Sequence, residues 1–135
     1  MLNQVIPSIQ IKKLVIEYLK DLVNHAHGNL VTFRPAKIGN DLKLKFKSEK
    51  GVNTIIRSFL VELEDLGLIV TIKKTARGVV YGIFKNHVKE IDVKKSPLFW
   101  KLLQEFSTDE ILYIIDKLHK SDITFGELVL SLIRT

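Results

Sequence analysis

Residues 52–85 read VNTIIRSFLVELEDLGLIVTIKKTARGVVYGIFK, and the change of hydrophobic period inside this stretch decides the fold. In its first half apolar residues recur three and four positions apart, which predicts a helix with one buried face. These residues are Val52, Ile56, Phe59, Leu60, Leu63 and Leu66. Gly67 follows, and a glycine at this position commonly ends a helix. Beyond it apolar residues alternate on both sides of a short turn, which predicts a two-stranded hairpin.

A long helix that runs through a glycine into a hairpin with a basic tip resembles the second half of a winged helix-turn-helix domain. The segment Leu63-Glu64-Asp65-Leu66-Gly67-Leu68-Ile69 is similar to the joint between recognition helix and wing in that superfamily. The resemblance covers about residues 8–85. It implies a recognition helix that enters the major groove of DNA, and a wing beside it, as in small archaeal-type transcription regulators.

The residues before this stretch supply the other elements of such a domain. Ser8 can cap a first helix that runs to about His25 or Ala26, and residues 30–33 can form a short strand that pairs with the wing. Pro35 suits the first turn of a second helix, in which Gly39 stands where the superfamily usually has alanine. Residues 42–47, LKLKFK, alternate with a period of two, so they fit either the end of this helix or a strand. The recognition helix is expected to open at Ser48, with Gly51 in its first turn.

The C-terminal third is expected to be helical. Residues 87–96 are polar enough for a linker, and Ser96-Pro97 can open a helix. Residues 107–110 and 124–127 each match a capping box that opens a further helix. The expected organisation is therefore a mainly α, α+β chain. It has a winged helix-turn-helix domain at 1–86, a linker at 87–96 and a helical extension at 97–135.

The charge is divided unevenly along the chain. The formal net charge is +6. Residues 1–86 contain 14 basic and 7 acidic residues, whereas residues 87–135 contain 7 basic and 8 acidic residues. All of the excess positive charge thus falls in the first part. This asymmetry indicates a polyanionic partner for the first part and another role for the extension.

The candidate DNA contacts lie on the recognition helix, just before it and on the wing. Arginine can grip guanine, asparagine can pair with adenine, and hydroxyl groups suit base edges or phosphates. Cations at a hairpin tip can contact the DNA backbone or minor groove. The candidates are Lys47, Ser48, Lys50, Asn53, Thr54, Arg57, Ser58, Lys73, Lys74 and Arg77. An ordinary solvated helix face, and lysines that protect a strand edge, would use the same residue types.

The sequence offers little for catalysis, metal binding or a membrane. It contains no cysteine, no phosphate-binding glycine loop and no motif of a catalytic triad, so neither an enzyme nor a cofactor is expected. His25 and His27 are explained by the dipole of the preceding helix rather than by a metal. No apolar run approaches the roughly 18 residues that span a bilayer, and no signal peptide pattern opens the chain, so a cytoplasmic location is expected.

The expected function is binding of double-stranded DNA by a transcription regulator that acts as a homodimer. The C-terminal helices carry more apolar surface than they can bury among themselves, so they would pack on the first helix or on a second copy. They could also bind another protein. Two further readings remain open: a winged-helix module for protein interaction, and a DNA-binding accessory factor of replication or plasmid maintenance.

Overall fold

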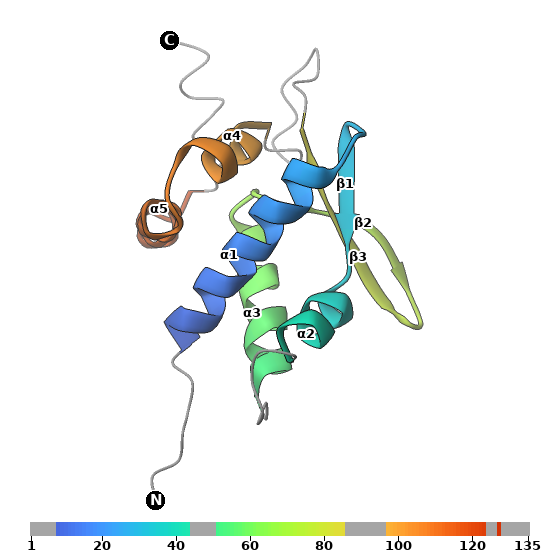
Figure 1. Ribbon diagram of the computed structural model, residues 1–135. Coiled ribbons are helices and arrows are strands. Elements are labelled where there is room, and N and C mark those ends of the chain that lie inside the picture. Colours follow the sequence, from blue (N-terminus) through green and yellow to red (C-terminus); the bar gives the residue numbers. More distant parts are fainter. Residues whose placement is uncertain (1–7, 44–50, 86–96, 124–126, 128–135) are drawn as a thin grey trace, which may run out of the picture.

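The computed structural model describes residues 8–43, 51–85, 97–123 and 127. Within these residues the chain is mainly helical, with five helices and one small antiparallel sheet of three strands (Figure 1). The elements are α1 (Ser8–His25), β1 (Leu30–Phe33), α2 (Pro35–Lys43), α3 (Val52–Asp65), β2 (Val70–Thr75), β3 (Gly78–Phe84), α4 (Pro97–Glu105) and α5 (Thr108–Lys120). This confirms the α+β class. The expected linker and, apart from Glu127, the expected helix after residue 124 lie outside the described residues.

The first strand joins the hairpin, as its position in the sequence suggested. β1 pairs antiparallel with β3, with Leu30 opposite Phe84 and Phe33 opposite Tyr81. β2 pairs with the other edge of β3, so the order in the sheet is β1-β3-β2. The end of β1 and the start of α2 therefore lie beside the hairpin, although more than forty positions separate them in sequence.

The start of α3 differs from the expectation. The helix begins at Val52, and Gly51 is its N-cap rather than a first-turn residue. The reason is the backbone at Gly51, whose φ of 89° is left-handed and so cannot belong to a right-handed helical turn. Ser48, where the helix was expected to open, lies outside the described residues.

The end of α3 follows the expectation. Gly67 has a φ of 83°, and its N–H donates to the Glu64 carbonyl at 2.9 Å. The N–H of Leu68 donates to the Leu63 carbonyl, also at 2.9 Å. This pair of hydrogen bonds is the Schellman motif, which satisfies the last helical carbonyls and turns the chain toward β2.

The hairpin has a tighter turn and a less regular strand than its sequence suggested. Only Ala76 and Arg77 connect the strands, so Lys73 and Lys74 belong to β2 and not to the tip. The pairing shifts register between Thr71 and Lys73, which indicates a β-bulge. The bulge breaks the strict alternation, and Ile72 is 38% exposed as a result.

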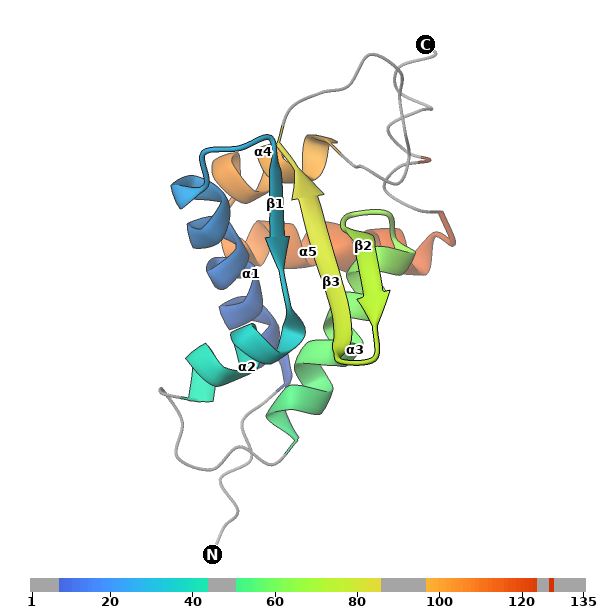
Figure 2. The same cartoon turned by 90° about the vertical axis from the view of Figure 1, so that its right-hand side faces the viewer.

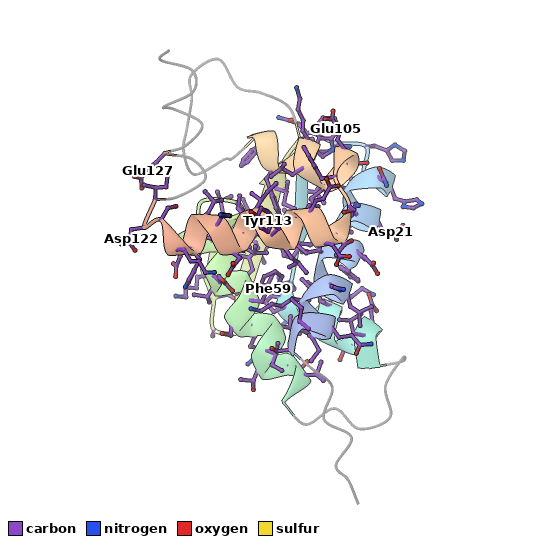
Figure 3. All side chains as sticks on the ribbon, turned by 90° about the vertical axis from the view of Figure 1, so that its left-hand side faces the viewer. Asp21, Phe59, Glu105, Tyr113, Asp122 and Glu127 are labelled. Carbon is purple, nitrogen blue, oxygen red and sulfur yellow. The ribbon has the colours of Figure 1, made fainter. Side chains whose placement is uncertain are left out.

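The core lies between the sheet and the C-terminal helices. Figures 2 and 3, seen from opposite sides, show the sheet on one face and α5 on the other, with α1 and α3 between them. Side chains from all of these elements form one continuous apolar cluster; those from α4 and α5 are Phe99, Leu103, Ile111, Ile115 and Leu118. The capping box predicted at Ser107 is present, and Glu110 completes it. None of the helices in the described ranges has the length and apolarity needed to cross a membrane.

Candidate nucleic-acid interface

A groove of about 680 Å³ opens between α3, the start of α2 and the β2–β3 hairpin. In Figure 1 the hairpin extends away from the helices on the side of α2 and so forms one wall. The residues that line the groove are Arg34, Pro35, Ala36, Arg57, Val61, Glu64, Thr71, Lys74, Thr75, Ala76, Arg77, Gly78, Val79 and Tyr81. Three separate parts of the chain therefore build it.

The periodicity of each element explains which side chains face the groove. On α3, Arg57, Val61 and Glu64 are four and three positions apart, so they form one row along the helix. On the hairpin, Thr71 is opposite Tyr81 and Lys74 is opposite Val79, which puts these pairs on one face of the sheet. Lys73 is opposite Val80 and points to the other face.

The groove is cationic, and its positive charges have no anionic partners in the described residues. Arg34, Arg57, Lys74 and Arg77 are exposed, and their side chains form no ion pair or hydrogen bond with any residue that the structure describes. Lysines elsewhere do form such pairs; examples are Lys12 with Glu62, Lys13 with Asp109, Lys37 with Asp41 and Lys120 with Asp116. The groove thus concentrates positive charge that an incoming anion can neutralise.

One carboxylate and one tyrosine complete the lining. Glu64 accepts a hydrogen bond from the hydroxyl of Thr71, which ties the end of α3 to β2. Tyr81 is only 5% exposed, and burial, followed by the charges of Glu64 and Asp65, raises the pKa of its hydroxyl. Tyr81 therefore stays protonated at neutral pH and can donate a hydrogen bond.

The structure brings together part of the predicted site. Arg57, Lys74 and Arg77 line the groove, whereas Thr54 and Ser58 are exposed on α3 outside it. Lys73 is exposed on the opposite face of the hairpin. Lys47, Ser48 and Lys50 lie outside the described residues.

Asn53 does not face fully outward, as its helical position had suggested. Its side chain is half-buried and packs over Gly39 of α2, where an added Cβ would overlap the Asn53 Oδ1 atom. The glycine thus allows α2 and α3 to cross closely, which is the spacing role expected for a small residue at this position. The amide is directed to the neighbouring helix more than to solvent.

Arg34 and Tyr81 are among the lining residues that were not candidates. Arg34 directly follows β1, and its carbonyl accepts the N–H groups of Lys37 and Ile38 in the first turn of α2. Its position beside the hairpin depends on the pairing of β1 with β3, and the only local signal was its place before Pro35. Tyr81 was treated only as one of the alternating residues of the predicted hairpin.

No metal centre accompanies the groove in the part of the chain that the structure describes. There, no group of three or more His, Cys, Asp or Glu side chains could hold an ion. His25 contacts Asp21 one helical turn earlier, with 3.3 Å between Nδ1 and Oδ1. That contact is an ordinary helical pair.

No protein-family model, curated protein or solved structure shows a significant match to this chain.

Proposed function

We propose that this protein binds double-stranded DNA as a winged helix-turn-helix domain, with α3 as recognition helix and the β2–β3 hairpin as wing. The observation that carries the proposal is the concave groove with four cations that lack partners among the described residues. DNA presents a dense row of phosphates, and its binding is driven largely by cations that neutralise them. The arrangement supports a phosphodiester strand seated between α3 and the hairpin.

The order of the elements supports the same reading. The chain runs α1, β1, α2, α3, β2, β3, and β1 pairs with β3, the second strand of the hairpin and the central strand of the sheet. This is the order that the winged-helix resemblance implies. Thr54, Arg57 and Ser58 are exposed on α3, where side chains of these types can contact base edges.

We further propose a role as a transcription regulator that binds DNA as a homodimer. A two-fold dimer would place two copies of α3 on successive turns of one duplex. A protein-interaction module would leave the unpaired groove cations without a role. Footprinting on the flanking genomic DNA separates regulation from replication: protection of the protein's own promoter supports a regulator, and protection of an origin or repeat array supports an accessory factor.

The test compares two groove cations on duplex DNA of selected and random sequence. Arg57→Ala should reduce the preference for the selected site by roughly 1–3 kcal/mol, because a base contact is lost. Lys74→Ala should weaken binding to all sequences alike, because a phosphate contact is lost. For the same reason, the slope of the logarithm of the binding constant against the logarithm of salt concentration should decrease in magnitude by about one. Fluorescence anisotropy over a series of salt concentrations measures both effects.

Lys101→Ala is the matched control, because Lys101 is an exposed cation on α4 that does not line the groove. It should leave both the affinity and the salt slope unchanged. The proposal is wrong if the wild-type protein does not associate with duplex at low ionic strength, or if Lys101→Ala weakens binding as much as Lys74→Ala.

A further inference from the structure

Tyr81 combines a buried ring with a position on the wall of the cationic groove. The ring packs beside Phe33, with 6.0 Å between the ring centroids, so the body of the side chain belongs to the core. The residue also lines the groove, as do Arg57 and Arg77. The aromatic ring of Tyr81 therefore lies in the core, whereas its hydroxyl group faces the groove.

The Tyr81 hydroxyl has no hydrogen-bond partner among the described residues, in contrast to Tyr18, whose hydroxyl donates to Asp41 Oδ2 at 2.9 Å. Tyr113 is 61% exposed and reaches water. A buried tyrosine hydroxyl normally has a partner. In the described parts of the chain, the only fully enclosed side-chain polar atom without a partner is Gln104 Nε2, so the Tyr81 hydroxyl keeps access to the groove.

The chemistry of the surroundings selects the partner of this hydroxyl. As a protonated donor, it needs an acceptor, and the three arginines and the lysine of the groove attract an anion. A phosphodiester group supplies both, because its two non-bridging oxygens carry the charge and accept several hydrogen bonds. A neutral base edge could accept the hydrogen bond from the hydroxyl, but it carries no negative charge for the surrounding cations to neutralise.

We propose that the Tyr81 hydroxyl donates a hydrogen bond to one backbone phosphate of a DNA strand held in the groove, where the surrounding guanidinium groups neutralise that phosphate. The proposal rests on the proposed function and adds a neutral donor, fixed by the core, to a set of mobile cations. Because a buried ring holds the hydroxyl, it determines how deeply the strand sits between α3 and the hairpin. Tyr81 is thus a binding residue and a positioning residue for the DNA backbone.

The test is Tyr81→Phe in the full chain, with a fluorescein-labelled duplex of random sequence as the probe. The substitution removes only the hydroxyl, so the dissociation constant should rise about tenfold, the effect of losing one hydrogen bond to a charged group. The midpoint of thermal unfolding should not fall, because the hydroxyl makes no hydrogen bond to any residue that the structure describes. Tyr113→Phe, on the exposed side of α5 (Figure 3), should bind as the wild type does.

A second readout locates the phosphate. Single methylphosphonate substitutions remove one charge at a time from a duplex of the selected sequence, on which one register is favoured. At one position the wild type should lose affinity much more than Tyr81→Phe does. If Tyr81→Phe binds within twofold of the wild type while the wild type keeps salt-dependent binding, the inference fails and the proposed function stands. If the wild type does not bind duplex at all, both fail.

Discussion

At the scale of single residues, a hydrogen bond between two side chains joins α1 to α2. The Tyr18 hydroxyl donates to Asp41, and Lys37 Nζ lies 3.3 Å from the other carboxylate oxygen. The bond to Tyr18 is the main cause that lowers the pKa of Asp41, with Lys37 adding to it and burial opposing it. Burial, the same hydrogen bond and the negative charge of Asp41 raise the pKa of Tyr18 to about 12.

The stabilising effect of this bond should therefore depend on pH at both extremes. Asp41 has a folded pKa below 3.8, so its contribution is present above that pH and is lost as the pH falls through the lower, folded value. Tyr18 has a folded pKa above 10.0, so its contribution is complete below pH 10.0 and is lost as the pH rises toward about 12. The difference in free energy of unfolding between the wild type and Tyr18→Phe should be constant at intermediate pH and should decrease at both low and high pH. Urea unfolding over a pH series measures it, and a difference independent of pH would contradict the prediction.

At the scale of elements, α2 and α3 cross at Gly39 and Asn53. Gly39 gives the space that the Asn53 amide occupies, and the buried side chains of Ile38 and Leu42 flank this contact on α2. A glycine within a helix costs roughly 1 kcal/mol relative to alanine. At this position the glycine lowers helix propensity but leaves the space that the Asn53 side chain occupies.

A double-mutant cycle tests whether residues 39 and 53 are coupled in this way. In an Asn53→Ala background, Gly39→Ala should raise the free energy of unfolding by about 1 kcal/mol, because only the gain in helix propensity remains. In the wild-type background the gain should be smaller or reversed, because the Asn53 side chain has to leave its position. Urea unfolding of the four proteins gives the coupling. Equal effects in both backgrounds would show that Asn53 does not occupy the space beside Gly39.

At the scale of the whole molecule, α4 and α5 complete the core under α1. Phe99 is fully buried in the same apolar cluster as Phe59 of α3. Lys13 on α1 lies 2.9 Å from Asp109 at the start of α5, and Lys20 Nζ donates to the carbonyl of Phe106 at the end of α4. The described parts of the C-terminal helices thus pack against the same chain.

Because this core is shared, Phe99→Ala should destabilise the whole protein and not only the extension. We expect a loss of about 3–5 kcal/mol, the usual cost of the cavity that such a truncation leaves. Urea unfolding followed by both near- and far-ultraviolet circular dichroism should still give one coincident transition. Two separate transitions would mean that the extension folds as an independent unit.

The proposed homodimer is tested on the full chain by sedimentation equilibrium. We expect a species of twice 15.5 kDa. A monomer at micromolar concentration, in the presence and absence of duplex, would contradict the dimer.

The sequence by itself determined the elements whose signals are local. The apolar period of α3, the glycine stop at Gly67, the following hairpin and the capping box at Ser107 each depend on residues a few positions apart. The sequence also assigned three of the groove cations, Arg57, Lys74 and Arg77, to the predicted helix and hairpin, although it put Lys74 at the hairpin tip and not in β2.

Only the tertiary structure decided how these elements meet. Pairing of β1 with β3 brings Arg34 to the groove, and the close helix crossing at Gly39 turns Asn53 inward. The same packing leaves the Tyr81 ring in the core and its hydroxyl on the groove. Each of these outcomes depends on contacts between residues far apart in the chain. Hydrophobic period and helix caps carry no information about such contacts, because they report only the neighbours of a residue along its own element.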